Sequence, residues 1–235
     1  MATKTPVATK TSRRADAIPA VADAGCIIFD FDGTLAPNLD LPDLRRRVIE
    51  LTRTHGVPDE VLEDLFIVEI VTAATRWLAD RNPELAHNYH REGHDLITNF
   101  EIEAARQTAP FPEIRQALSQ LRMADKRLGV VTRNCAQAVR TVFKDIDHFC
   151  HSVLARDDVV HLKPDARHVR QALDALEQPP ERALMVGDGA LDMRVGRSLD
   201  MFCVGVLTGS GSSAQLKEAG AQLVLPRAAD LLDFM

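Results

Sequence analysis

Residues 26–37 read CIIFDFDGTLAP, and the architecture of this chain can be worked outward from that stretch. Its first four residues are apolar, as in a strand that helices cover on both faces. Asp30 and Asp32 follow, and Gly33 begins a turn. Ligands bind at the carboxyl ends of the strands of a parallel sheet, so acids at such an end are candidates for chemistry. Taken alone, the same two acids are also consistent with a turn cap, because aspartate favours turns.

Further apolar runs of similar length lie along the chain, with helical patterns between them. They are bounded by Gly, Asp or Pro and are almost continuously apolar, which predicts strands buried on both faces. This alternation of strands and helices is typical of an α/β fold with a parallel sheet flanked by helices. The strands are predicted at residues 26–30, 128–132, 152–155, 183–187, 202–206 and 222–225.

One long stretch interrupts the alternation. Residues 41–108 contain no convincing strand, and apolar residues recur there at intervals of three or four, as in amphipathic helices. This pattern predicts an all-helical insertion, residues 38–108, within a core made of residues 25–37 and 109–235. The helical period is carried by Leu62, Phe66, Ile70, Ala73, Trp77, Leu96, Ile97 and Phe100. Of these, Phe66, Ile70 and Trp77 are expected in the core of the insertion.

The composition excludes several classes of function. The 235 residues are 46% hydrophobic, which is sufficient for a substantial core, and the formal charge of −6 argues against stable binding of nucleic acid. No run approaches the roughly 20 apolar residues of a membrane helix, so no membrane partner is expected. Cys26, Cys135, Cys150 and Cys203 form no CxxC pair, which predicts free thiols in a reducing compartment, here the cytoplasm. Residues 1–24 are predicted to be a disordered tail, with an organellar targeting peptide as the alternative.

A second acidic pair lies in VGDGALDM, residues 186–193. Asp188 ends a predicted strand, and Asp192 follows at the i,i+4 spacing that places both carboxylates on one side of a helix. Acids are also favoured at any helix N-terminus, which is the ordinary explanation. Together with Asp30 and Asp32, however, four carboxylates would converge on one edge of the sheet and would repel one another unless a hard cation lay among them.

A hydroxyl and an ammonium group complete the set of candidate groups. Thr132 ends one predicted strand, and Lys163 precedes a proline and a helical run. A transferring phosphoryl group requires a hydrogen-bond donor and a fixed positive charge, and these two side chains would supply them at strand ends. Viewed alone, Thr132 is more simply a threonine at the end of a strand, and Lys163 is more simply a surface lysine.

The motifs DFDGT, VVTRN, LKP and VGDGALD, in that order, resemble the four motifs of haloacid dehalogenase superfamily phosphatases. The resemblance runs from about Gly25 to the C-terminus and is greatest to the phosphoglycolate-phosphatase-type members, which carry a helical cap after the first motif. It implies a Rossmann-like parallel sheet flanked by helices with an inserted all-helical cap domain. It also implies Mg²⁺-dependent hydrolysis of a small organic phosphate monoester through an aspartyl-phosphate intermediate.

The resemblance implies a catalytic role for four residues. Asp30 matches the nucleophile that attacks phosphorus, and Asp32 matches the general acid and base. Thr132 would bond a phosphoryl oxygen. Lys163 would restrain the nucleophile and offset the charge of the phosphoryl group.

The implied cofactor is Mg²⁺, which favours about six oxygen ligands. Asp30, the backbone carbonyl of Asp32, and Asp188 would bind it, with Asp192 as a further ligand or a support. The family often has Ser or Thr directly after the fourth-motif aspartate, whereas this chain has Gly189.

Two residues after Thr132 are candidates for contact with the substrate. Arg133 stands where small or amide residues are common in the family, and Asn134 follows it; loop residues facing solvent are the alternative for both. Asp32 argues against cleavage of carbon–halogen or carbon–phosphorus bonds, because the members with those activities lack an aspartate there. The expected partner is a small phosphorylated metabolite, phosphoglycolate first, bound by a monomer or homodimer. A phosphomutase of the same superfamily and a non-catalytic binding protein are the alternatives.

Two other segments attract attention and are predicted to have ordinary roles. HNYHREGH, residues 87–94, brings His87, His90 and His94 onto one helical face near Tyr89 and Arg91. A solvated face is expected there, with binding of an anionic substrate or of a metal as alternatives. GSGSS, residues 209–213, lacks the Lys-Thr or Lys-Ser of a P-loop and is predicted to be a turn.

Overall fold

The structure is a computed structural model that describes residues 19–235. The chain forms two compact units, one from the residues up to Asn38 together with Thr108–Met235, and the other from Leu39–Gln107. The first unit contains the sheet and the second contains helices alone among its regular elements, apart from one 3-10 turn.

The first unit is built on a six-stranded parallel sheet in the order β3-β2-β1-β4-β5-β6. All six predicted strands are present, each to within one residue at either end. Short parallel strands of this kind are apolar throughout because helices cover both faces. The observed bounds are β1 (Cys26–Phe29), β2 (Arg127–Val131), β3 (Ser152–Leu154), β4 (Ala183–Gly187), β5 (Phe202–Val206) and β6 (Leu223–Leu225).

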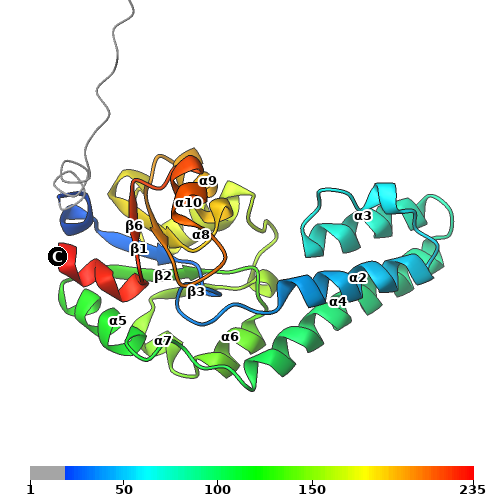
Figure 1. The fold of residues 1–235 in the computed structure, drawn as a ribbon, viewed down its shortest axis with the longest axis horizontal. Helices are drawn as coiled ribbons and strands as arrows, with labels where there is room; N and C mark the ends of the chain where they lie inside the picture. Colours follow the sequence, from blue (N-terminus) through cyan, green and yellow to red (C-terminus); the bar gives the residue numbers. More distant parts are fainter. Residues whose placement is uncertain (1–18) are drawn as a thin grey trace, which may run out of the picture. The chain divides into compact units, whose positions relative to one another are not determined.

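Two groups of helices flank this sheet, as Figure 1 shows. One group comprises α5 (Ile114–Met123), α6 (Ala136–Val142) and α7 (Ile146–Phe149), and the opposite group comprises α8 (Ala166–Ala175), α9 (Ala190–Ser198) and α10 (Ser213–Glu218). The unit also contains short 3-10 helices at η2 (Arg156–Asp158), η3 (Pro180–Arg182) and η4 (Ala228–Phe234).

The helices are held on the sheet by apolar stripes. In α8, Val169, Ala172 and Leu173 are buried at three- and four-residue intervals, which places them on one helical face. They join Ile28 and Met185 of the sheet in one continuous hydrophobic core. The sheet is therefore fixed from this side, and the carboxyl ends of its strands are presented on a rigid support.

Residues 19–24, the last part of the predicted disordered tail, are ordered. Residues 1–18 lie outside the described residues. Residues 19–23 are helical and Val21 is fully buried. The Lys126 ammonium donates to the carbonyls of Ala22 and Ala24, at 2.5 and 2.7 Å. The prediction of a disordered segment is therefore wrong for residues 19–24, because a buried side chain and two hydrogen-bonded carbonyls fix them to the core.

The second unit has its own hydrophobic core. Its elements are α2 (Leu41–Thr54), η1 (Asp59–Val61), α3 (Ile67–Ala79) and α4 (Pro83–Ala105), which confirms the helical reading of this stretch. Asp40 and Asn82 cap α2 and α4 by accepting hydrogen bonds from backbone amides, and a proline follows in the first turn of each helix. Val48, Ile70 and Ile97 are buried where the three helices meet.

Two details of this unit differ from the prediction. Phe66 precedes α3 and is 46% exposed, so it is not a core residue, whereas Ile70 is buried and Trp77 packs against the core half-buried. Tyr89 does not lie on an exposed face with the histidines. Its ring is fully buried, and its hydroxyl lies 2.7 Å from the Thr52 hydroxyl. The helical period does not include Phe66, because the chain is extended at that residue and α3 begins at Ile67.

All four cysteines are buried free thiols, as predicted. Burial raises the pKa of Cys26, Cys150 and Cys203 to about 12, so these thiols stay protonated and behave as small apolar side chains. Across residues 19–235, no helix combines the length and the apolar character needed to cross a membrane. The cytoplasmic location remains a prediction.

Candidate active site

The strand order brings the two acidic motifs to one place. In the order β3-β2-β1-β4-β5-β6, the chain changes direction between β1 and β4, which makes a topological switch point. Phe29 pairs with Val186, and the Asp30 amide donates to the Val186 carbonyl at 2.8 Å. Asp30 and Asp188 therefore leave the carboxyl ends of two adjacent strands, as the sequence predicted.

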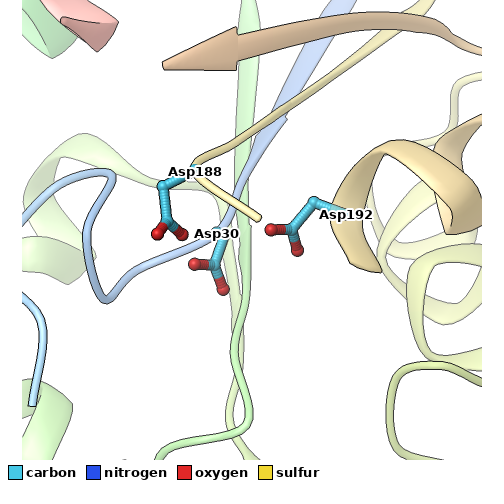
Figure 2. Close-up of side chains that lie close together, drawn as sticks. All are labelled: Asp30, Asp188 and Asp192. Carbon is cyan, nitrogen blue, oxygen red and sulfur yellow. The ribbon is translucent and has the colours of Figure 1, made fainter. Parts of the chain in front are cut away.

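Three buried carboxylates form a cluster at this switch point. Asp30, Asp188 and Asp192 are 8%, 5% and 4% exposed, and one oxygen from each lies within 4.8 Å of the others. Figure 2 shows Asp30 between the other two, with all three carboxylates turned towards a common centre. Carboxylate oxygens at this separation suit a hard divalent cation such as Mg²⁺.

Lys163 links two members of the cluster. Its ammonium donates to Asp30 Oδ1 at 2.8 Å and to Asp192 Oδ1 at 2.7 Å, and the side chain is 1% exposed. Burial lowers the pKa of Lys163, but attraction by Asp192 and Asp30 outweighs burial and holds the pKa above its ordinary value. Lys163 is therefore a permanent cation. It lies in the loop between η2 and α8, so the predictions of a strand-end position and of a surface lysine are both wrong.

The cluster has an excess of negative charge. Burial raises the pKa of Asp30, and repulsion by Asp192, Asp188 and Asp32 raises it further, while Lys163 opposes the shift. One ammonium group cannot neutralise three buried carboxylates, so the net effect on Asp30 is strongly upward. A divalent cation would offset this charge, and the donor set therefore fits the predicted Mg²⁺.

Asp192 reaches the cluster by a different local route from the one predicted. Asp188 is not helical, because Gly189 is the N-cap and α9 begins at Ala190. The two acids thus do not share a helical face, and the turn between them brings their side chains together. A Cβ atom at Gly187 would lie 2.5 Å from the Asp192 carboxylate, so only glycine fits at the end of β4.

Asp32 lies beside the three-carboxylate cluster without belonging to it. Its carboxylate accepts hydrogen bonds from Asn134 Nδ2 at 3.1 and 3.2 Å, and more weakly from the Thr132 hydroxyl at 3.5 Å. The side-chain oxygen Oδ1 of Asn134 accepts from the backbone amide of Cys135 at 2.9 Å, which fixes the orientation of the Asn134 side chain. Asp32 is half-exposed, unlike Asp30, so it is accessible to a proton donor or acceptor.

Neither residue after Thr132 is a solvent-facing loop residue. Asn134 is 3% exposed and holds Asp32. Arg133 is half-buried, and its guanidinium donates to the Lys163 carbonyl. Thr132 is fully buried, and its hydroxyl accepts from the Asn134 amide at 3.0 Å. Residues 132–134 of the VVTRN motif thus support both Asp32 and the loop that contains Lys163.

The loop after β5 is the part of the site that the sequence reasoning missed. Residues 209–213, predicted to be a turn, are a bend at 209–210 that leads to the N-cap Ser212 and to Ser213, the first residue of α10. Within this loop, Ser210 donates to Asp188 Oδ2 from both its amide, at 2.6 Å, and its hydroxyl, at 2.9 Å. Thr208 donates to the Gly33 carbonyl at 2.6 Å. The alternation of glycine with serine was the available signal, since glycine permits close approach of a backbone to another group.

The histidines of α4 make no comparable site. His87 and His90 are exposed and His94 is half-buried, with the His90 and His94 rings 4.4 Å apart. Within the described part of the chain, the Asp30–Asp188–Asp192 cluster is the single group of three or more His, Cys, Asp or Glu side chains with the spacing of metal ligands. The metal alternative for these histidines is therefore not supported.

This chain is similar in sequence and in fold to several known proteins. The pyrophosphatase PpaX of Bacillus velezensis is 28% identical over 216 residues, which are 88% of this chain and 94% of that protein. A solved hydrolase from Pseudomonas syringae has a TM-score of 0.66 at 22% identity, covering 89% of this chain and 96% of its own. A predicted phosphoglycolate phosphatase from Haemophilus somnus has a TM-score of 0.62 at 19% identity, covering 90% and 97%.

The solved structures establish likeness of fold, and the sequence match goes further. A sequence profile of the haloacid dehalogenase-like hydrolases matches residues 25–200, a range that contains Asp30, Lys163, Asp188 and Asp192. All four predicted motifs lie within it. The chain therefore belongs to the haloacid dehalogenase-like hydrolases.

Proposed function

We propose that this protein hydrolyses a small organic phosphate monoester, with Mg²⁺ as its cofactor and Asp30 as the nucleophile. The observation that carries the proposal is the buried cluster of Asp30, Asp188 and Asp192 with the Lys163 ammonium bonded to two of its members. Such a group can bind a cation and hold a carboxylate ready for attack, and the family membership agrees with hydrolysis.

In the first step, an oxygen of Asp30 attacks phosphorus and forms an acyl phosphate, while the bond from phosphorus to the leaving oxygen breaks. Lys163 holds Asp30 in one orientation, because its ammonium donates a hydrogen bond to Asp30 Oδ1 at 2.8 Å. Asp32 gives a proton to the leaving alkoxide. The Asn134 amide, at 3.1 Å from the Asp32 carboxylate, orients this acid towards the substrate.

In the second step, water attacks the same phosphorus and breaks its bond to Asp30. Asp32, now a carboxylate, takes a proton from that water, which restores the starting protonation state of the site. Inorganic phosphate leaves and Asp30 is a free carboxylate again. Thr132 and Lys163 are the groups proposed to bond phosphoryl oxygens and offset their charge.

Asp30, the Asp32 carbonyl and Asp188 are the proposed ligands of the cation, with Asp192 as a support through Lys163. A bound Mg²⁺ supplies positive charge that stabilises the phosphoryl oxygens in the transition state. Arg133 and Asn134 remain candidates for substrate contact in addition to their internal bonds.

Two substrates have specific support. Phosphoglycolate follows from the resemblance of the motifs to phosphoglycolate-phosphatase-type members. Inorganic pyrophosphate follows from the relative named pyrophosphatase, which matches 88% of this chain. The same pair of aspartates would serve both, because each reaction transfers a phosphoryl group to Asp30 and protonates a leaving oxygen.

The test is release of inorganic phosphate from a panel of phosphomonoesters and from pyrophosphate, with Mg²⁺ and with excess EDTA. Metal-dependent release concentrated on one compound is expected. The Asp30→Asn variant should fold normally and lose turnover, since an amide cannot form the acyl phosphate. Turnover by that variant would remove Asp30 as the nucleophile, and interconversion of phosphate esters without net phosphate release would indicate a mutase.

A further inference from the structure

We propose that Ser210 is a positioning residue that holds the Asp188 carboxylate in the orientation needed to bind the cation. The inference rests on the proposed function, because it concerns the cation site of that function. It adds a residue outside the four motifs, from the loop between β5 and α10.

Ser210 concentrates its hydrogen bonds on one oxygen of Asp188. Its amide and its hydroxyl both donate to Oδ2, at 2.6 and 2.9 Å, and Asn38 Nδ2 lies 3.4 Å from the same oxygen. A carboxylate with several donors on one oxygen has a single preferred orientation, which leaves the other oxygen to bind a cation. Asp188 is thus oriented before any cation arrives.

The loop is built for close approach to Asp188. A Cβ atom at Gly209 would lie 2.0 Å from Asp188 Oδ2, so any larger residue would displace the carboxylate. On the other side of Ser210, the Gly211 amide donates to the Asp188 carbonyl at 3.0 Å. Glycines on both sides of Ser210 therefore let the backbone contact Asp188 while the serine side chain reaches the carboxylate.

The same loop is anchored to the turn that follows β1. The Thr208 hydroxyl donates to the Gly33 carbonyl at 2.6 Å, and a Cβ atom at Gly33 would lie 2.7 Å from Asp188 Oδ2. Asp188 is thus enclosed by two loops that hydrogen-bond to each other. These contacts fix Ser210 relative to both acidic motifs.

An ordinary helix-capping role does not account for Ser210. Ser212 is the N-cap of α10, and its hydroxyl accepts from the Gln215 amide at 3.3 Å. Ser210 is an exposed residue, whereas Asp188 is buried, so removing the Ser210 hydroxyl leaves no cavity in the core. The two serines therefore separate a positioning role from a structural one within a single loop.

The experiment measures the affinity of the full-length protein for Mg²⁺ alone, by isothermal titration calorimetry without substrate. We expect Ser210→Ala to weaken binding about tenfold, the lower end of the effect of removing such a support, because the Ser210 amide still donates to Asp188. Ser210→Thr keeps the hydroxyl and should restore the affinity. Ser212→Ala is the matched control, which should lower the melting temperature and leave Mg²⁺ affinity unchanged.

A kinetic measurement accompanies the titration. In Ser210→Ala, the Mg²⁺ concentration for half-maximal phosphate release should rise by the same factor, while kcat at saturating Mg²⁺ is retained. Equal Mg²⁺ affinity in wild type and Ser210→Ala, or an equal loss in Ser212→Ala, would overturn the role of Ser210 and leave the proposed function intact. Absence of Mg²⁺ binding by the wild-type protein would overturn the proposed function and this inference with it.

Discussion

Replacing Lys163 by Met should leave two buried carboxylates without their cation. The ammonium lies 2.8 Å from Asp30 and 2.7 Å from Asp192, and all three side chains are buried. Removing one partner of a buried ion pair costs about 3 to 5 kcal/mol, because the remaining charge is uncompensated. We expect a loss of that size in the free energy of unfolding at pH 8 in EDTA.

The loss should depend on pH in a defined direction. Without Lys163, the folded-state pKa of Asp30, already raised by burial and by its acidic neighbours, rises further above the unfolded value. A carboxyl group with a raised folded-state pKa favours the folded state at low pH, and this stabilisation is lost as pH rises towards the folded-state pKa. Each extra proton bound by the folded state changes the free energy by about 1.4 kcal/mol per pH unit. The cost of Lys163→Met should therefore shrink from pH 8 to pH 5.

The assay is urea unfolding of wild type and variant in EDTA at several pH values, repeated with Mg²⁺. Lys126→Met is the matched control, because Lys126 is also buried but donates only to the carbonyls of Ala22 and Ala24. Its cost should not change between pH 5 and pH 8 or on adding Mg²⁺. A cost of Lys163→Met below 1 kcal/mol, or one independent of pH, would refute the charge argument.

Two further predictions concern buried side chains away from the carboxylates. His168 accepts from the Lys163 amide at 3.2 Å, and burial, with the Lys163 charge, lowers its pKa to about 4 from an ordinary 6.5. The neutral imidazole stabilises the fold fully above pH 6.5, and this stabilisation is lost as pH falls towards 4. In urea unfolding, the free energy of unfolding of wild type should therefore fall by about 2 kcal/mol from pH 7.5 to pH 5 relative to that of His168→Asn. An equal dependence on pH in the two proteins would contradict this. Tyr89→Phe removes the 2.7 Å hydrogen bond to Thr52 and should lower the free energy of unfolding by about 1 kcal/mol in the same assay. Phosphate release should not change. An unchanged urea midpoint would show that the bond contributes nothing to stability.

The fold followed from the sequence more closely than the site did. Each strand of a doubly covered parallel sheet is buried on both faces, so its apolar run appears in the sequence without interruption, as at residues 183–187. The acids of the switch point were equally visible, since Asp30 and Asp188 directly follow such runs. Helix boundaries were less certain, and Phe66 shows that periodicity alone does not locate an N-terminus.

The contacts of the site were not accessible in the same way. Lys163 lies in a loop, and its bonds to Asp30 and Asp192 join positions far apart in the chain. Arg133 and Asn134 looked like solvent-facing loop residues by local criteria, yet each donates to a group of another loop. A hydrogen bond between distant residues leaves no periodic pattern for a sequence to display.

What the sequence predicts and what only the tertiary structure decides differ for a physical reason. Burial acts on whole segments, so the order of apolar runs predicts an α/β core and a helical insertion, while the phosphatase assignment comes from the resemblance of the four motifs to a known family. Orientation of a carboxylate depends on a few ångströms between loops brought together by the strand order. For that reason only the tertiary structure placed Ser210 against Asp188 and Lys163 between Asp30 and Asp192.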